Sequence, residues 1–251
     1  KNKLNRLFLM MTFVFSTLLF IISLIACYFA YSDKKTQFLT SIDSVYSQIN
    51  QEYENILMNF WQVYMPIFEN NSSVRGTFQQ YFSTQNPADL SPQEKLALSQ
   101  ALDQMIVRDS RIDWIVLYSD NRKNNYIKYS NNSVVTALPD TFPYLEDMNT
   151  KKSKLEVYGA KEVNHNSTRT FAVCGGVPTG MGQGKILIGY RTDKFKALSK
   201  TLTVPIPSIR FYILSNKQII FDSADEYTID TLYIPADLQE GIVNHNDNHL
   251  Y

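Results

Sequence analysis

Residues 7–31 read LFLMMTFVFSTLLFIISLIACYFAY, and this run decides the architecture of the chain. It contains no charged residue, no glycine and no proline. A helix of about 20 apolar residues crosses the hydrocarbon core of a bilayer, so the run predicts a transmembrane helix at residues 7–32. A core helix of a soluble domain would carry a polar face, which this run lacks.

The charges on either side of the run predict its orientation. Three basic residues precede it within residues 1–6, whereas residues 33–35 read Asp-Lys-Lys. The excess of positive charge before the run is small, and the positive-inside rule makes residues 1–6 a cytoplasmic N-terminus. Residues 33–251 are then expected outside the cytoplasm, held at the cell membrane by one helix or by two.

The same run also allows a lipoprotein signal. Residues 24–27 read Leu-Ile-Ala-Cys and resemble a bacterial lipobox, in which the cysteine is lipidated after cleavage. Against this, the apolar stretch before Cys27 is longer than a signal-peptide core of about 7–15 residues, and apolar residues continue beyond Cys27. Both interpretations place the rest of the chain outside the cytoplasm.

Composition restricts the class of protein further. The formal net charge is zero, so this region offers no electrostatic case for binding nucleic acid. Its two cysteines are Cys27, inside the apolar run, and Cys174, far beyond it, so no intrachain disulfide is expected. A cysteine-poor exported domain of this size fits the surface of a Gram-positive bacterium.

A long amphipathic helix follows the apolar run. Between residues 38 and 67, apolar side chains recur at alternating spacings of three and four, and Pro66 marks the approximate end. We therefore expect a stalk helix at residues 33–69. A helix that continues out of the membrane can pair with the same helix of a second copy, so a homodimer through the stalk is expected.

Beyond residue 70 the pattern predicts an α+β fold. A helix begins with Ser91-Pro92-Gln93-Glu94, which combines an N-cap, a proline at the first helical position and a glutamate at the third. Five strands are expected in one antiparallel sheet, and two more form a second hairpin. The expected strands are 112–118, 126–130, 154–163, 168–177, 185–192, 208–214 and 218–222, with helices at 74–82, 91–109, 193–201 and 235–243 and an irregular segment at 131–152 that carries a helical turn at 144–148.

Three segments carry a resemblance to a known family. They are 112–121, 175–178 together with 184–190, and 211–223, and the last reads FYILSNKQIIFDS, a strand, a tight polar turn and a strand that ends in Asp-Ser. Their order resembles the double Cache (dCache, PAS-like) extracytoplasmic sensor region of Gram-positive bacterial membrane receptors. The resemblance implies a membrane-distal Cache module at 70–204 and a partial membrane-proximal module at 205–251.

The resemblance also implies a function in signal transduction. A small-molecule ligand (a sugar, an organic acid or a peptide) or a partner protein would bind the distal module. The output would be transcription regulation by an AraC-type DNA-binding domain beyond residue 251, or alternatively a sensor histidine kinase of a two-component system. A surface-tethered lipoprotein, or an adhesion or scaffold protein, is a further alternative. The Arg-x-Trp-Tyr cluster with which some Cache sensors bind amino acids is absent from this sequence.

Strand alternation suggests where a ligand would bind. Arg169, Phe171 and Val173 share one face of their strand, and Ile186, Ile188 and Tyr190 share one face of theirs. A PAS-like pocket would combine such a face with residues 139–148, which we call the lid segment. An arginine would hold an anionic group, and aromatic rings would stack on an apolar or sugar-like body. The candidate ligand-binding residues are Tyr126, Lys128, Tyr144, Arg169, Phe171 and Tyr190.

Motifs that would indicate an enzyme or a metalloprotein are weak or missing. No Gly-x-Ser-x-Gly or His-Glu-x-x-His pattern occurs. His245 and His249 have a helical metal-ligand spacing, but Asn-Asp-Asn between them opposes a helix. We therefore predict no catalytic residue, no metal site and no cofactor in this region, which makes it a non-enzymatic sensor.

Overall fold

The computed structural model describes residues 2–69, 72–83, 89–119, 125–150, 155–163, 169–177, 180–201, 211–215 and 218–223. They belong to two compact units, one comprising residues 1–47 and 202–205 and the other residues 48–201 and 206–251. The helix expected at 235–243 and the three histidines, at 165, 245 and 249, lie outside the described residues.

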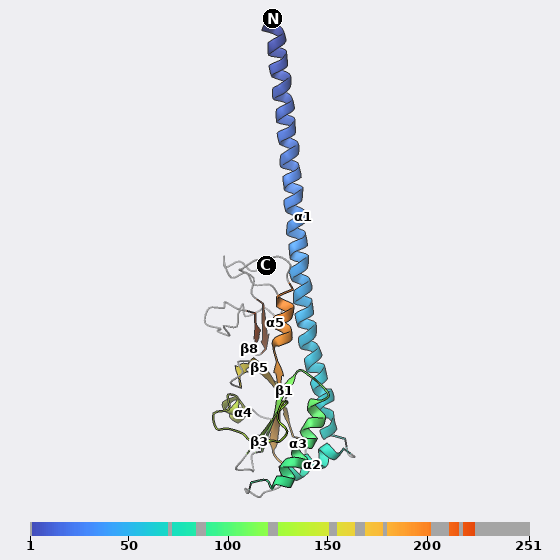
Figure 1. Ribbon diagram of the computed structural model, residues 1–251, viewed down its shortest axis with the longest axis vertical. Helices are drawn as coiled ribbons and strands as arrows, with labels where there is room; N and C mark the ends of the chain where they lie inside the picture. The colour runs from blue at the N-terminus through green and yellow to red at the C-terminus, as the bar shows by residue number, and fades with distance from the viewer. Residues whose placement is uncertain are drawn as a thin grey trace. The chain divides into compact units, whose positions relative to one another are not determined.

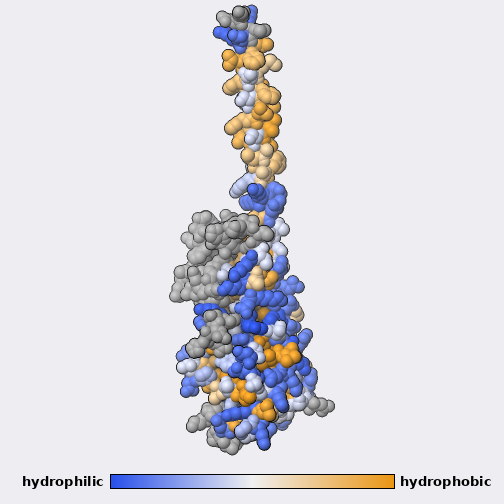
Figure 2. All heavy atoms as spheres, in the orientation of Figure 1, coloured by the Kyte–Doolittle hydropathy of each residue, from blue (hydrophilic) through white to orange (hydrophobic). Residues whose placement is uncertain are grey.

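The first unit consists of the N-terminal part of helix α1, which runs without a break from Asn2 to Tyr64 and ends in a short 3-10 turn, η1 (Met65–Ile67). Among the described residues, α1 is the one helix long and apolar enough to cross a membrane, and its apolar window has no buried side chain. Figure 2 shows the hydrophobic colour along this stretch. The expected apolar helix that continues into a long second segment is confirmed, and it ends next to Pro66 as the sequence predicted.

The second unit is built on one antiparallel sheet of six strands. These are β1 (Ile112–Ser119), β2 (Tyr126–Tyr129), β3 (Thr136–Ala137), β4 (Glu156–Glu162), β5 (Arg169–Gly176) and β6 (Gly184–Arg191), in the order β3-β2-β1-β6-β5-β4. The antiparallel sheet with flanking helices is confirmed, with one more strand than the five predicted. The extra strand, β3, lies in the segment that was expected to be irregular. It was not predicted because its two residues are too few to show an alternating pattern.

Helices surround the sheet: α2 (Ser73–Ser83), α3 (Pro92–Ile106), α4 (Leu145–Thr150) and α5 (Asp193–Ser199). The predicted cap of α3 is present in full. The Glu94 backbone N–H donates to Oγ of Ser91, and the Ser91 backbone N–H donates to Oε2 of Glu94 at 2.8 Å. This capping box fixes the start of the helix at Pro92.

The two faces of the sheet are covered by different elements (Figure 1). On one face, which we call the helix face, Tyr81 of α2 donates a hydrogen bond to the Leu117 carbonyl, and Tyr53 of α1 packs against Phe171 of β5. The other face, the lid face, carries Trp114 and packs against the lid segment and α4. The sheet is therefore the middle layer of this unit.

The predicted second hairpin is also present, as β7 (Tyr212–Ser215) paired with β8 (Gln218–Asp222). It packs beside β4, where the Gly159 backbone N–H donates to Oε1 of Gln218 at 2.7 Å. An aromatic contact between Phe195 of α5 and Phe221 of β8 adds to the attachment. The hairpin is thus joined to the edge strand of the large sheet.

Candidate functional site

The lid face carries a buried aromatic cluster. Trp114 packs edge-on against Phe142 of the lid segment, with ring centroids 5.2 Å apart, and lies 5.5 Å from the ring of Tyr144. Tyr158 of β4 extends the group on the other side of Tyr144. The buried members of this core are Trp114, Val116, Ile127, Phe142, Tyr144, Met148, Tyr158, Ala172, Cys174 and Leu187.

Polar groups inside this apolar cluster are paired. The indole N–H of Trp114 donates to Oγ1 of Thr170 at 3.0 Å. The hydroxyl of Tyr144 lies 3.0 Å from the Gly159 carbonyl oxygen, also contacts the Thr170 carbonyl, and accepts the Lys161 backbone N–H at 3.1 Å. Burial raises the pKa of Tyr144, so its hydroxyl keeps its proton and can donate at all physiological pH values.

Two lysines hold the lid segment to the strands below it. Nζ of Lys161 donates to Oδ2 of Asp147 at 2.5 Å and to the Pro143 carbonyl at 2.8 Å, and it lies 5.0 Å from the centre of the Tyr144 ring. Nζ of Lys185, on β6, donates to the Met148 carbonyl. Because Lys161 and Asp147 remain partly exposed, solvent reaches this ion pair. These contacts hold the lid segment against β4 and β6.

The structure separates the six candidate residues between the two faces. Tyr144 alone lies in the lid-face cluster. Tyr126 packs against Tyr81 of α2, the buried ammonium of Lys128 pairs with Asp103 of α3 at 3.0 Å, and Tyr190 stacks on Phe171 beneath α1, all on the helix face. Arg169 begins β5 and is half-buried. Ligand contact by any of the six stays a prediction.

The sequence analysis assigned the wrong face of β5 and β6 to the lid segment. Phe171 and Tyr190 face the helices, whereas the residues between them in sequence, such as Thr170 and Ala172, lie under the lid segment. Alternation defines two faces of a strand but does not say which one a distant loop covers. Trp114 was the available signal for the lid-covered face. A buried tryptophan needs a hydrogen-bond partner for its N–H, so it favours a face that also carries polar groups.

A second notable group joins α1 to the sheet on the helix face. The guanidinium of Arg111 makes two contacts with Asp109, at 2.6 and 2.8 Å, and donates to Oε1 of Glu52 on α1 at 2.8 Å. Lys194 of α5 reaches the other oxygen of Glu52 at 2.5 Å. Hydrogen bonding to Asp109 raises the pKa of Arg111, so this cation is permanent. Glu52 thus connects α1 with β1 and α5.

The outer side of α1 in the second unit exposes apolar side chains. Met58, Trp61, Met65 and Phe68 are 40–59% exposed, at spacings of three, four and three residues. The spacing of Met58 and Trp61 matches a helix-pairing seam of α1, and Met65 of η1 and Phe68 just after it extend the apolar row. We call these four residues the outer stripe.

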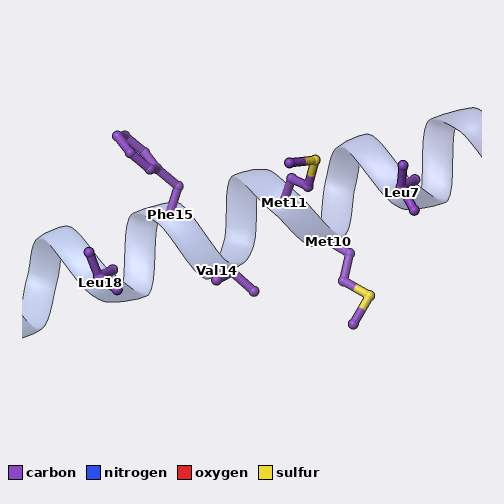
Figure 3. Close-up of a pocket in the computed structure, with 6 residues that line it drawn as sticks. All are labelled: Leu7, Met10, Met11, Val14, Phe15 and Leu18. Carbon is purple, nitrogen blue, oxygen red and sulfur yellow. The ribbon is translucent and has the colours of Figure 1, made fainter.

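A shallow hollow with an apolar lining lies on the N-terminal part of α1 (Figure 3). Its lining residues, Leu7, Met10, Met11, Val14, Phe15 and Leu18, all belong to one helix and follow its surface. A hollow on a single apolar helix matches lipid tails or another helix better than a soluble ligand. It is therefore not a candidate ligand pocket.

The lid face carries one cysteine, Cys174. Cys174 is buried, and burial raises the pKa of its thiol to about 11, which leaves it protonated and unreactive. Among the described residues, no group of three or more His, Cys, Asp or Glu side chains could hold a metal ion. The aromatic side chains of the lid face are buried and packed against one another, and the polar groups among them are paired.

No family model matches this sequence, and no curated protein matches it. Solved structures are similar in fold. The extracellular domain of vpHK1S-Z8, named a histidine kinase, is 9% identical over 63% of this chain, with a TM-score of 0.42. This chain therefore spans about three fifths of the length of that domain, 60%.

Two chemoreceptor domains from Campylobacter jejuni are also similar. The periplasmic sensory domain of Tlp1 is 10% identical over 73% of this chain and 72% of its own, with a TM-score of 0.46. The ligand-binding domain of Tlp3, solved in complex with L-valine, is 11% identical over 72% of this chain and 73% of its own, with a TM-score of 0.39. At these identities the matches assign no ligand and no output to this chain.

Proposed function

We propose that this chain is the extracytoplasmic ligand-sensing region of a transmembrane signalling receptor, and that it binds its signal rather than transforming it. The observation that carries the proposal is the continuity of α1. One uninterrupted helix contains the apolar run and also supplies Tyr53 and Tyr64, which contact the sheet. A change in the sheet can therefore reach α1 through direct contacts.

The double Cache organisation remains part of this proposal. The six-stranded sheet corresponds to the distal module at 70–204, and the β7–β8 hairpin to the beginning of the proximal module at 205–251. The output is proposed from the resemblance alone: an AraC-type DNA-binding domain, with a histidine kinase as the alternative. The coding sequence downstream of residue 251 distinguishes the two, because the first predicts a helix-turn-helix pair and the second a kinase core.

We place the ligand between the lid segment and the lid face. The lid segment, which includes Phe142 and Tyr144, packs on Trp114 and Tyr158, with the Tyr144 hydroxyl and the Thr170 carbonyl as polar groups. This combination suits a small molecule with an apolar body and one or two hydrogen-bonding groups. A sugar, an organic acid or a peptide meets the description, and half-buried Arg169 could pair with an anionic group at the start of β5.

A ligand screen tests the position of this site. Thermal unfolding of the whole chain in lipid nanodiscs is followed with sugars, organic acids, amino acids and short peptides. A ligand that raises the melting temperature should do so less in Tyr144→Phe and in Arg169→Ala. Tyr126→Phe is the matched control, because Tyr126 is an equally buried tyrosine on the helix face. A shift that persists in Tyr144→Phe and disappears in Tyr126→Phe would move the site to the helix face.

The homodimer is proposed to form through the outer stripe. Two copies anchored by the same N-terminal helix stand parallel in one membrane, so the stripe of one copy meets the stripe of the other in a two-fold arrangement. Exposed methionine and tryptophan side chains are typical of the centre of an interface. These arguments support a second copy as the occupant of this surface.

Disulfide trapping in membranes tests the dimer. In a Cys27→Ser background, Met58→Cys should form a cross-linked dimer under mild oxidation. Leu96→Cys is the control, since Leu96 of α3 is 51% exposed but lies outside the outer stripe. Equal cross-linking of the two variants would contradict pairing through the stripe.

Topology is tested separately on intact cells. Protease added from outside should digest the region after residue 33. A chain that stays undigested until the cells are opened would contradict the extracytoplasmic position.

A further inference from the structure

The strand β4 contains an irregularity directly under the lid segment. Tyr158 pairs with Ala172 and Lys161 pairs with Thr170, so two residues of β4, Gly159 and Ala160, stand opposite the single residue Phe171. This is a β-bulge, which interrupts the ladder and leaves backbone groups without strand partners. In such a position the free groups must find other partners.

Gly159 finds those partners on both sides of β4. Its carbonyl oxygen lies 3.0 Å from the hydroxyl of Tyr144, in the lid segment. Its N–H donates to Oε1 of Gln218 at 2.7 Å, in β8. The same tyrosine hydroxyl accepts the Lys161 N–H, so it fills the bulge from the lid side. One residue thus holds the lid segment and the second hairpin at once.

The close approach of β8 favours glycine at position 159. A Cβ on Gly159 would lie 3.0 Å from Cβ of Gln218 and 3.0 Å from the Ile219 carbonyl oxygen. Any side chain here would require β8 to move away by a few tenths of an ångström. Gly159 therefore contacts the lid segment through its carbonyl and β8 through its N–H.

We propose that the Tyr144–Gly159–Gln218 chain is a relay that couples the position of the lid segment to the β7–β8 hairpin. The inference rests on the proposed function, because it supplies a route from a ligand under the lid segment to the proximal module. When the Tyr144 hydroxyl leaves the bulge, the Gly159 carbonyl and the Lys161 N–H lose their contact with it, the bulge rearranges, and the hydrogen bond to Gln218 weakens. Tyr144 and Gln218 act in this relay as positioning residues.

Hydrogen exchange of the whole chain in nanodiscs, without ligand, tests the relay in the direction from lid to hairpin. Tyr144→Phe removes the hydroxyl and keeps the ring. Amide exchange in residues 218–222 should become about fivefold faster, the effect of losing one ordinary hydrogen bond. Tyr158→Phe is the matched control, because the hydroxyl of Tyr158 donates to Glu156 rather than to Gly159. Exchange in 218–222 that is equal in the two variants would overturn the relay.

A second experiment tests the relay from the hairpin to the lid segment. It substitutes Gln218, on which folding depends less than on Tyr144. Gln218 is half-buried, and Gln218→Ala should accelerate exchange in the lid peptide 142–148 by a similar factor. Gln104→Ala, at an exposed position of α3, should leave that peptide unchanged. Unchanged lid exchange in Gln218→Ala would overturn the relay even if Tyr144→Phe fails to fold.

These readouts separate the relay from the proposed function. A ligand that shifts the melting temperature while neither variant changes exchange at the far end removes the relay and leaves the sensor intact. If both variants change hydrogen exchange at the far end but no compound in the screen shifts the melting temperature, the relay is supported and the sensor function is not.

Discussion

The indole of Trp114 lies against the backbone of Gly189, its partner across the β1–β6 pair. A Cβ at position 189 would stand 2.1 Å from Cε2 of the indole, far inside any van der Waals contact. Glycine is therefore what allows the largest side chain of the lid-face cluster to lie flat on the sheet.

Gly189→Ala is expected to destabilise the fold for this reason. The added methyl forces Trp114 from its place and breaks its bond to Thr170, and overpacking of this kind costs about 1–3 kcal/mol. Urea unfolding of the chain in detergent measures the change. Gly76→Ala is the control: no atom lies within 4 Å of the added Cβ in α2, so the helix should gain about 0.5–1 kcal/mol. A stable Gly189→Ala would show that the indole has room to move.

Local signals in the sequence were sufficient for the elements but not for their contacts. The capping box at Ser91 and Glu94 and the alternation in residues 112–118 depend on neighbours along the chain, and the elements they predicted are present. The glycine at position 159 was an ambiguous signal. A glycine within a strand indicates either a bulge or a close approach of another segment, and the sequence does not say which. Here both reasons apply.

The candidate site was harder to predict because it depends on long-range register. Choosing between Thr170 and Phe171 as the lid-facing residue requires knowing which face the lid segment covers, and strand parity alone is symmetric. The ion pair of Glu52 with Lys194 spans 142 positions, and no spacing rule connects residues so far apart. Tyr144 was predicted because it lies in the lid segment itself.

The Glu52 contacts predict a second stability effect. Glu52→Gln should leave Lys194 without its partner and Arg111 with Asp109 alone. Breaking a fully buried ion pair costs roughly 3–5 kcal/mol, but Lys194 is 60% exposed, so we expect about 2 kcal/mol. Urea unfolding compares this variant with Glu54→Gln, an exposed position two residues away in α1. A loss no larger than that of the control would mean that solvent already screens the network.

Asp113 predicts a dependence of stability on pH. Burial raises the pKa of its carboxyl; nearby Arg191 opposes the rise, and Asp193 adds to it. A raised pKa means that the folded state disfavours the ionised form, so this group lowers stability at neutral pH. The penalty disappears as the pH falls through the folded pKa towards the ordinary value of 3.8.

Asp113→Asn should therefore be more stable than the parent at pH 7 and equal to it near pH 3. Melting temperatures of both proteins across this range provide the measurement. The control is Asp140→Asn, which alters an exposed carboxylate in the lid segment. If Asp113→Asn is instead less stable at pH 7, attraction to Arg191 outweighs burial.

Cys174 should resist thiol reagents in the folded chain. Its side chain is buried, and burial raises the pKa of the thiol to about 11, so the thiolate is scarce at pH 8. In a Cys27→Ser background, maleimide should label the chain at least tenfold faster in urea than under native conditions. Rapid native labelling would indicate that the edge strand β4 frequently separates from β5.

Cys27 decides between a spanning helix and a lipid anchor. Its side chain is exposed on α1, which continues as a helix on both sides of it, and apolar residues follow as far as Tyr31. A spanning helix is held by about 20 buried apolar residues, so Cys27→Ser should remain fully in the membrane fraction after a high-salt wash. A lipoprotein would lose its anchor and appear in the soluble fraction, because the retained acyl chains depend on that one sulfur. Fractionation of cells that express either form, with blotting against the second unit, separates the two outcomes.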